Sequence, residues 1–567
     1  MSTAVEPVVE TSNNAVAFPT LSAADLASLR PLGKICKYED GQVVFRAGDA
    51  DIDLFVVESG AIDILNPADG DKLIVSHTPG QFSGDIDLLT RRPVIVTAVA
   101  NGPTTVLRVP GARLREVLNK VPSLSEKMLL AIQERRRMLT SGGTMGLKVV
   151  GPGKCRDTTA VREFLFKNFV PFNWIDSEAE AGKQLLVDWG SPKKTPVIEL
   201  GNRQRLLCPT LRELAHAAGV WRHVPEDIVD LAVIGGGPAG MAAAVYAASE
   251  GVNTIVIDRL GPGGQAAGSS KIENFIGFPS GLSGAELATR GVLQMLKFGA
   301  KMIAPVEVDK IVPCGDDRPY HQLHLDCGHV LQARTILLAA GVKWRRLEAE
   351  NAAKYEAAGI HYACTTVEAT LYNERDVAVV GAGNSAGQAA MFLAECCRDR
   401  TVHMFIRKKL GPGMSDYLVG RIRATPNLKV YEQTTITAVH GGRLIESVTA
   451  ETVGYDGATV DNAGATKFSR QIPLGAVFVF IGAEPGCGWL PEGIARDELG
   501  YIYTGVDALK SGRWPLKDRE PCPLETTVPG ILAAGDIRAG STKRVGFAVG
   551  DGSLAVTCVH KLTAIRR

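Results

Sequence analysis

The sequence has no CxxC or CxxxC motif and no cluster of cysteine with histidine, although it contains eleven cysteines in 567 residues. Such motifs bind structural zinc or form redox-active dithiols, and dense cysteines build disulfide scaffolds. Their absence argues against both a zinc-stabilised and a disulfide-stabilised fold. Cys396 and Cys397 are adjacent, but they follow an Ala-rich helical stretch where we expect thiols to be buried by packing.

An excess of charge is also missing, because 62 basic residues face 61 acidic ones. No global field would therefore draw the chain to nucleic acid or to an anionic membrane. The N-terminal residues form neither a basic nor an apolar targeting segment, and no apolar run approaches the roughly 20 residues of a membrane span. We expect a cytoplasmic protein that has no nucleic-acid or membrane partner.

Residues 18–139 read as short strands separated by Gly and Asp turns and followed by helical text, which predicts a small β-roll closed by a helix. Through Gly41-Gln42-Val43-Val44-Phe45, Glu58-Ser59-Gly60 and Gly80-Gln81-Phe82-Ser83-Gly84-Asp85 this segment resembles the cyclic-nucleotide-binding domain. The family's Gly-Glu pair is Gly84-Asp85 here, and its arginine position falls on Pro93 or Val94, with Arg91 and Arg92 out of register. A cyclic nucleotide or a protein partner at the β-roll, and a degenerate scaffold, all stay open.

Residues 147–219 predict a compact α/β unit that resembles the thioredoxin/glutaredoxin fold. The resemblance implies a cis-proline at Pro196 and a redox cysteine at the start of the first helix. That position reads Cys155-Arg156-Asp157-Thr158, so the second thiol is replaced. We expect Cys155 to be structural, with a low-pKa thiol as the alternative, because disulfide exchange stalls without a resolving cysteine.

A glycine-rich motif follows a hydrophobic strand in "VDLAVIGGGPAGMAAAVYAASEG". Gly235 suits a tight turn, Gly237 lets the backbone approach a pyrophosphate at a helix N-terminus, and Gly240 allows helix and strand to touch. Asp258 ends the next strand, 23 residues after Gly235, where a carboxylate can hold a ribose hydroxyl. The pattern predicts a dinucleotide-binding fold.

A second such motif begins 146 residues later in "DVAVVGAGNSAGQAAMFLA". Its candidate binding residues are Gly381, Gly383, Asn384, Ser385 and Ala386. The following strand ends in Arg407, Lys408 and Lys409 rather than in an acid. Cations at this place suit a 2′-phosphate, so NADPH is favoured over NADH, with a solvated basic turn as the alternative.

Together with "GPGGQAAGSSKIENFIGFP" and "GILAAGDIRAGSTKRVGFAVGDG", the two motifs resemble low-molecular-weight thioredoxin reductases. The resemblance implies FAD held by Asp258 and Asp536, with Asn274 beside the isoalloxazine and the backbone near Val545 at its N1/O2 edge. It also implies a homodimer and an NADPH domain inserted into the FAD domain. Gly263, Gly264, Gln265, Gly535, Arg544 and Ala548 complete the candidate FAD residues.

In these reductases a CxxC precedes the second motif and carries electrons from the flavin to thioredoxin. Counting back seventeen residues from Gly381 places Cys364 at the first cysteine position, and Val367 occupies the second. Glu368 matches the acid that is a candidate proton donor. The internal disulfide cannot form, so Cys364 is an inert remnant, a single reactive thiol or a partner of Cys155.

The predicted fold class is multidomain: a cyclic-nucleotide-binding-like β-roll, an α/β thioredoxin-like domain and a reductase with two Rossmann-like domains for FAD and NADPH. The predicted function is an NADPH-dependent FAD oxidoreductase whose electrons reach an acceptor other than an internal dithiol, such as a ferredoxin-like carrier, a quinone or a protein disulfide. The alternatives are a redox- or ligand-sensing flavoprotein with a partner-docking β-roll, and a thioredoxin reductase that uses an unusual cysteine pair. The predicted segments are a tail (1–18), the β-roll (19–143), the thioredoxin-like domain (144–226), the FAD domain (227–348 and 475–567) and the NADPH domain (349–474).

Overall fold

The computed structural model describes residues 15–141, 146–201, 203–269, 271–315, 318–356, 358–364, 366–453 and 467–566. Most of the predicted tail, residues 1–14, lies outside them. Contacts divide the chain into two units. Unit 1 holds Met1–Gly151, Val161–His223 and Thr289–Pro305, and unit 2 holds Pro152–Ala160, Val224–Ala288 and Val306–Arg567.

Unit 1 begins with the β-roll, whose strands pair antiparallel in the order β1-β5-β3-β4, with β2 on β5. The second half of β3 alternates buried and half-buried side chains, as a strand with one face on a core requires. Gly60 interrupts β3 at a φ of +78°. The elements are β1 (Lys34–Tyr38), β2 (Val43–Phe45), β3 (Leu54–Asn66), β4 (Lys72–His77), β5 (Thr97–Val109), α1 (Ala23–Leu29), α2 (Asp87–Thr90), α3 (Leu114–Lys120) and α4 (Pro122–Ser141).

The next sheet has the order β7-β6-β8-β9, in which β6 and β7 are parallel and the other pairs are antiparallel. This mixed order agrees with the predicted thioredoxin-like fold, and the Thr195–Pro196 peptide is cis as the resemblance implied. The elements are β6 (Leu147–Gly151), β7 (Phe172–Asp176), β8 (Val197–Glu199), β9 (Arg205–Leu207), α5 (Arg156–Lys167), α6 (Glu180–Asp188) and α7 (Leu211–Ala217).

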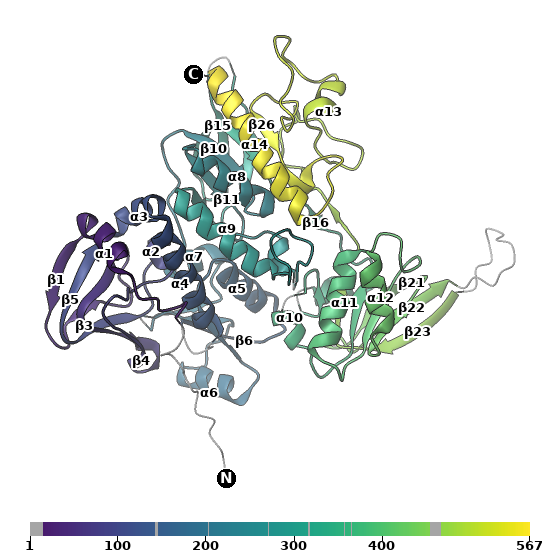
Figure 1. The fold of residues 1–567 in the computed structure, drawn as a ribbon. Coiled ribbons are helices and arrows are strands. Elements are labelled where there is room, and N and C mark those ends of the chain that lie inside the picture. Colours follow the sequence, from purple (N-terminus) through teal and green to yellow (C-terminus); the bar gives the residue numbers. More distant parts are fainter. Residues whose placement is uncertain are drawn as a thin grey trace. The chain divides into compact units, whose positions relative to one another are not determined.

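In unit 2, the strand order β11-β10-β15-β14-β13, with β26 paired to β15, forms the sheet of the first dinucleotide-binding domain. The side chains of β11 are all buried, and so are those of β10 except Asp230, because parallel strands are covered on both faces. The C-terminal helix α14 packs on α8 of this domain (Figure 1). The bounds in this unit are β10 (Val229–Ile234), α8 (Pro238–Ser249), β11 (Thr254–Ile257), β13 (Val308–Val312), β14 (His321–Leu325), β15 (Val330–Leu338), α13 (Gly505–Lys510), β26 (Ile531–Ala533) and α14 (Val545–Arg566). The helix α9 (Gly284–Phe298) begins in unit 2 and continues into unit 1, which also holds β12 (Lys301–Ile303).

The second dinucleotide-binding domain has an all-parallel sheet in the order β17-β24-β18-β19-β20 and a separate antiparallel sheet β21-β22-β23. Because β24 pairs with both β17 and β18, this sheet reaches past the predicted boundary at 474 to Val479. The bounds are β16 (Lys343–Trp344), β17 (Ile360–His361), α10 (Thr366–Thr370), β18 (Val377–Val380), α11 (Asn384–Cys396), β19 (Val402–Phe405), α12 (Asp416–Ala424), β20 (Leu428–Tyr431), β21 (Thr434–His440), β22 (Ser447–Val453), β23 (Lys467–Pro473), β24 (Ala476–Val479) and β25 (Ala483–Glu484).

The sheets confirm the predicted fold class. Among the helices that the structure describes, none combines the length and the apolar composition that a membrane span requires.

Candidate functional site

The first glycine loop joins β10 to α8. Gly235 has a φ of +108°, and a Cβ there would lie 2.4 Å from the carbonyl oxygen of Ala339. Gly237 is the N-cap of α8, so the free N–H groups at the start of the helix face this loop. Such an N-terminus after a tight turn attracts an anion through its N–H groups and its dipole. The loop has the backbone geometry of the predicted pyrophosphate site.

Two other glycines allow α8 to approach its neighbours closely. A Cβ at Gly240 would lie 1.9 Å from the Gly235 carbonyl oxygen, and one at Gly552 would lie 2.1 Å from the Ala239 carbonyl oxygen. Neither distance is open to a side chain in a packed interior, because both obstacles are backbone atoms. The missing side chain of Gly240 therefore allows α8 to lie close to the glycine loop, and that of Gly552 allows α14 to pack closely on α8.

Asp258 follows β11 and is bound to backbone on both of its oxygens. Oδ2 accepts a hydrogen bond from the Gly236 N–H at 2.7 Å, while Oδ1 accepts from Leu260 and Gly261 at 2.9 and 2.8 Å. Hydrogen bonds to an ionised carboxylate are stronger than neutral ones. The acid predicted to hold a ribose hydroxyl thus also fixes the glycine loop in place.

The segment after β11 lies against the first glycine loop. Gly263 donates its N–H to the Gly236 carbonyl at 2.8 Å. A Cβ at Gly264 would come within 2.8 Å of the Gly237 Cα. Gln265 donates from Nε2 to the Val342 carbonyl. The structure therefore brings these three predicted residues together, whereas Asn274 is exposed on a bend further along the chain.

The last part of the chain returns to the start of α8. Gly535 has a φ of +76°, and a Cβ there would lie 3.0 Å from the Ala239 Cβ. Burial raises the pKa of the neighbouring Asp536 carboxyl, and its carbonyl accepts from Lys543 Nζ at 2.9 Å. The other predicted residues here are Arg544, which is exposed, Val545, which begins α14, and Ala548, which is buried on α14.

The sequence reasoning missed one residue of this part. Asp551 accepts the Gly535 N–H at 2.9 Å and binds the Arg538 guanidinium at 2.9 and 3.0 Å. It therefore holds the turn that carries Asp536. An acid between two glycines in the final helix was the signal that could have pointed to it.

The second glycine loop joins β18 to α11. Gly381 has a φ of +142°, and a Cβ there would lie 2.4 Å from the Phe480 carbonyl oxygen. Gly383 is the N-cap of α11, and no atom lies within 4 Å of the position of its missing Cβ. Ala386 is fully buried in the third small position. Asn384 accepts the Ser415 N–H through Oδ1 at 2.8 Å, while Ser385 is exposed.

A basic turn follows β19, at the place that Asp258 occupies in the first domain. Arg407, Lys408 and Lys409 are exposed, and in the part of the chain described here no ion pair involves them. The Lys408 carbonyl accepts the Gln433 N–H at 3.1 Å, which fixes the turn. Three accessible cations can bind a phosphate on a nucleotide ribose.

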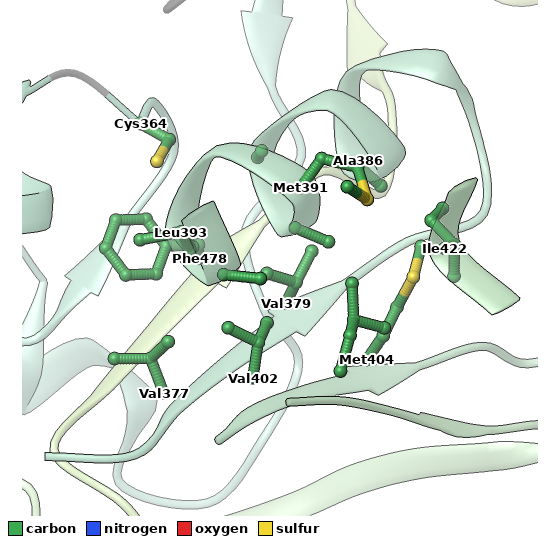
Figure 2. Close-up of a cluster of buried hydrophobic side chains, with 14 of the residues drawn as sticks. Cys364, Val377, Val379, Ala386, Met391, Leu393, Val402, Met404, Ile422 and Phe478 are labelled. Atoms are coloured by element: carbon green, nitrogen blue, oxygen red, sulfur yellow. The ribbon is translucent and has the colours of Figure 1, made fainter. Parts of the chain in front are cut away.

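Cys364 lies in the hydrophobic core of the second dinucleotide-binding domain, among residues that include Leu393 and Phe478 (Figure 2). Its side chain is 3% exposed, and burial raises its thiol pKa, with the Glu368 carboxylate adding to the effect. Glu368 is on α10, as is Val367, whose side chain lies outside the described residues. This environment favours the inert thiol over the nucleophilic thiolate.

The other predicted thiols have different surroundings. Cys155 is half-buried directly before α5, and the neighbouring Lys154 places its Nζ 5.0 Å from the centroid of the Tyr372 ring. The expectation that Cys396 and Cys397 are core residues was wrong, because Cys396 is exposed and Cys397 is half-buried. The helix ends at Cys396, where Arg400 donates to its Sγ at 2.7 Å.

In the β-roll, the segment around Gly84 and Asp85 is bound by arginines of α4. Arg136 pairs with Asp85 at 3.0 Å, and Arg135 donates to the Gly84 carbonyl at 2.5 Å and to the Phe82 carbonyl at 3.0 Å. The acid that replaces the family's glutamate therefore has an internal cation as its partner.

The predicted arginine position of the β-roll contacts the thioredoxin-like domain within unit 1. Arg92 donates to the Asn168 carbonyl, and Arg222 donates to the Thr90 carbonyl. A Cβ at Gly219 would lie 2.2 Å from Pro93 Cδ. Residues 90–93 thus form a docking contact within the chain.

Comparison with known families matches two separate parts of the chain. A model described as pyridine nucleotide-disulphide oxidoreductase matches residues 229–552, more than half of the chain, and one described as cyclic nucleotide-binding domain matches residues 35–121. The chain belongs to the pyridine nucleotide-disulphide oxidoreductases. The predicted resemblances to a reductase and to a cyclic-nucleotide-binding domain are confirmed.

The similarity to three individual proteins covers 58–59% of the chain. A 34.2 kDa protein in the rubredoxin operon of Clostridium pasteurianum is 30% identical over 337 residues, covering 59% of this chain and 97% of that protein. A component of the alkyl hydroperoxide reductase of Escherichia coli K12 is 29% identical over 335 residues, covering 58% of this chain and 57% of that protein. The structure of Lactococcus lactis thioredoxin reductase (FR conformation) aligns with a TM-score of 0.51 and 25% identity, over 59% of this chain and 99% of that chain.

The cofactors of this oxidoreductase are those of its family, FAD and NADPH. The residues present fit both. At the first loop, Gly237 and Gly264 leave a cradle that a Cβ at Gly264 would fill, next to the N-terminus of α8 and Asp258. At the second loop, the open N-cap at Gly383 and the exposed cations after β19 suit a dinucleotide with an additional phosphate.

Proposed function

We propose that the chain is an NADPH-dependent FAD oxidoreductase whose acceptor is not a conventional internal dithiol. The observation that supports this best is the pair of glycine loops with different strand ends, Asp258 in the first and a basic turn in the second. When bound, FAD accepts a hydride from NADPH and passes two electrons onward. The assignment of an acceptor outside the chain rests on Cys364 and Val367.

The chain's own residues bind and orient the two nucleotides. The first loop would hold the pyrophosphate of FAD at the start of α8, with Asp258 on a ribose hydroxyl and Asp536 on the returning segment. The second loop would hold NADPH, with Arg407 and Lys408 on its 2′-phosphate.

The acceptor must lie outside the conventional dithiol. Val367 has no sulfur, so a disulfide between positions 364 and 367 cannot form. Cys364 is buried and its pKa is raised, which disfavours attack by a single thiolate. A ferredoxin-like carrier, a quinone or a disulfide on another protein is then the class of acceptor.

Two experiments test this function. NADPH added anaerobically to the holoprotein should bleach the flavin absorbance, and an unchanged spectrum would rule out any reductase. Stopped-flow mixing of the reduced protein with thioredoxin, ferredoxin, quinone or oxygen should then show fast reoxidation by one acceptor. Fast reoxidation by thioredoxin that disappears in Cys364→Ser would contradict the proposed acceptor class.

A thioredoxin reductase that uses Cys155 with Cys364 is the alternative among enzymes. Lys154 contacts the ring of Tyr372, which shares a buried cluster with Cys364, and this favours the pair. The burial of Cys364 opposes it, because exchange requires access to the sulfur. Cys155→Ser and Cys364→Ser should each abolish turnover with thioredoxin if the pair works, and unchanged turnover would eliminate it.

We propose that the β-roll docks the thioredoxin-like domain rather than sensing a cyclic nucleotide. The contacts of Arg92 with Asn168 and of Arg222 with Thr90 support this role, since they use the segment where a phosphate would bind. Calorimetry with cAMP and cGMP should show no binding. A micromolar dissociation constant for either nucleotide, or a change in NADPH oxidation on adding it, would restore the sensor.

We propose that the chain forms a homodimer, because the reductases that it resembles are homodimers. Sedimentation of the holoprotein should give twice the mass of 60.3 kDa. A monomer would remove this part of the proposal and leave the electron path unaffected.

A further inference from the structure

The basic turn of the second dinucleotide-binding domain, Arg407-Lys408-Lys409, lies between two residues of the hydrophobic core. Ile406 is fully buried and Leu410 is 7% exposed, whereas the three cations between them are exposed. Close packing around a buried residue at each end fixes where this short turn leaves and re-enters the core. The cationic side chains are therefore accessible to a ligand, while the ends of the turn are held in place.

The backbone of the first part of this turn is bound to the junction between β20 and β21. Ile406 donates its N–H to the Tyr431 carbonyl at 2.9 Å, and the Ile406 carbonyl accepts the Thr434 N–H at 3.0 Å. In the middle of the turn, the Lys408 carbonyl accepts the Gln433 N–H at 3.1 Å. These three backbone hydrogen bonds fix the turn as far as Lys408.

The last part of the turn is bound by a side chain. Glu432 Oε1 accepts the Leu410 N–H at 2.8 Å. The Glu432 carbonyl accepts a hydrogen bond from the Thr434 hydroxyl at 2.7 Å, which fixes the backbone that carries the carboxylate. A hydrogen bond from a backbone N–H to an ionised carboxylate is stronger than one between neutral groups. Glu432 therefore attaches the end of the basic turn, beyond the three backbone bonds.

The segment that follows the turn leads back to the second glycine loop and has an attachment of its own. Met414 is buried in the same hydrophobic core as Leu410. Ser415 donates its N–H to Oδ1 of Asn384, the first residue of α11, at 2.8 Å. Because Asn384 fixes the far end, a change at Leu410 should affect the basic turn without disturbing the start of α11.

We infer that Glu432 is a positioning residue for the phosphate that distinguishes NADPH from NADH. The inference rests on the proposed function, in which Arg407 and Lys408 bind the 2′-phosphate. By holding the Leu410 N–H, the Glu432 carboxylate keeps the turn ordered before the nucleotide arrives, so binding does not have to order it. Without this acceptor the turn gains conformational freedom, and the loss of that freedom opposes phosphate binding. A nucleotide that lacks the 2′-phosphate does not use the turn and should be unaffected.

The charge of Glu432 makes the direction of the effect informative. A carboxylate beside the basic turn repels a phosphate that is bound there, so through charge alone its removal would strengthen phosphate binding. Through positioning, the loss of the acceptor weakens phosphate binding. Glu432→Gln removes the charge and keeps an oxygen that can accept the Leu410 N–H, whereas Glu432→Ala removes both. The two variants therefore separate the position of the turn from the charge of the side chain.

The test is calorimetry on the full-length holoprotein with adenosine 2′,5′-bisphosphate, which carries the 2′-phosphate, and with adenosine 5′-monophosphate, which lacks it. Glu432→Ala should bind the bisphosphate roughly three- to tenfold more weakly, as expected for the loss of one hydrogen bond, and the monophosphate as the parent does. Glu432→Gln should bind the bisphosphate at least as tightly as the parent. In steady-state oxidation, Glu432→Ala should raise the KM for NADPH by the same factor and leave kcat and the KM for NADH unchanged.

Glu374→Ala is the matched control and should bind both nucleotides as the parent does. Glu374 is exposed and precedes β18, so it lies at the opposite end of the parallel strands β18 and β19 from the basic turn. Unchanged or tighter bisphosphate binding in Glu432→Ala, or an equal weakening in Glu432→Gln, would overturn the role of Glu432 and leave the proposed NADPH site intact. A parent protein that binds the two nucleotides equally well would overturn this role together with the proposed 2′-phosphate site.

Discussion

The first glycine loop and residues 84–94 of the β-roll both occupy the phosphate-binding positions of the families that they resemble, yet their polar groups are used differently. In the glycine loop, α8 begins at Gly237 with N–H groups that lack an intrahelical partner, and the Asp258 carboxylate accepts hydrogen bonds from three neighbouring backbone N–H groups. In the β-roll, Asp85 is paired with Arg136, and Arg92 binds a carbonyl of the next domain. A motif specifies a backbone shape, but its neighbours decide whether the donors are available.

The difference has an energetic reason. A ligand at the glycine loop meets N–H groups that have no intrahelical partner, so binding satisfies them. A phosphate at residues 84–94 would have to break charge-assisted contacts that are largely shielded from water. Breaking a buried ion pair costs about 3–5 kcal/mol, which a single phosphate contact does not offset.

The largest effect should come from adding a side chain where α8 contacts the first glycine loop. In Gly240→Val, the new side chain would meet the Gly235 carbonyl oxygen, 1.9 Å from the position of its Cβ. We expect a loss of about 3 kcal/mol or more in stability and loss of FAD from the purified protein. Absorbance of the bound flavin measures this. Gly420→Ala on α12, where no atom lies within 4 Å, should retain full flavin content; equal content in both variants would refute the role of Gly240.

The next effect concerns the acid that fixes this loop. Asp258→Ala removes the acceptor of three backbone N–H groups as well as the proposed ribose contact. Hydrogen bonds to a charged group contribute about 1.5–3 kcal/mol, so FAD affinity should fall by roughly 10–100-fold. Fluorescence titration of the apoprotein with FAD measures the affinity. Asp230→Ala, at the opposite end of β10, should bind FAD normally, and a similar loss there would point to general destabilisation.

Much of this contrast could be predicted from the sequence. The glycine loops were predictable because positive φ angles and close helix contacts exclude side chains, as at Gly235 and Gly381, and because Asp258 and the basic turn directly follow buried strands. The interactions that Arg92 and Asp85 make could not be predicted from the sequence. Their partners Asn168 and Arg136 are 76 and 51 residues away in sequence, and no local pattern reports such contacts.

The cysteines show the same limit. The position of Cys364 followed from its spacing to Gly381, but the exposure of Cys396 did not follow from its Ala-rich helix, because the helix ends at that residue.

A smaller effect should separate the two glycine loops. Exchanging Arg407 and Lys408 for serine removes exposed cations but leaves the backbone of the loop unchanged. We expect the KM for NADPH to rise by about tenfold, because one phosphate contact is lost, while the KM for NADH stays the same. Steady-state oxidation of both nucleotides measures this. Lys429→Ser is the control. This exposed cation lies on β20, where its backbone is opposite His403 near the start of β19, and so it is away from the turn. A parallel rise for NADH would contradict a 2′-phosphate site.

The smallest effect tests the β-roll side of the comparison, where charges are engaged internally. Burial, together with the neighbouring Asp85 carboxylate, raises the pKa of Asp87 to about 7, against the opposing influence of Arg136 and Arg92. In the unfolded chain an Asp loses its proton near pH 4, so the contribution of this group is fully present below that pH and is lost as the pH rises to about 7. Asp87→Asn removes the titration. The unfolding temperature of the variant relative to the parent should therefore rise between pH 4 and pH 7, by about 2–4 °C for each kcal/mol. Thermal unfolding followed by circular dichroism measures the difference, with the exposed Asp71→Asn as control. A difference that stays constant, or that falls with pH, would mean that Asp87 is ionised in the fold and that the β-roll segment holds its charges at no cost in stability.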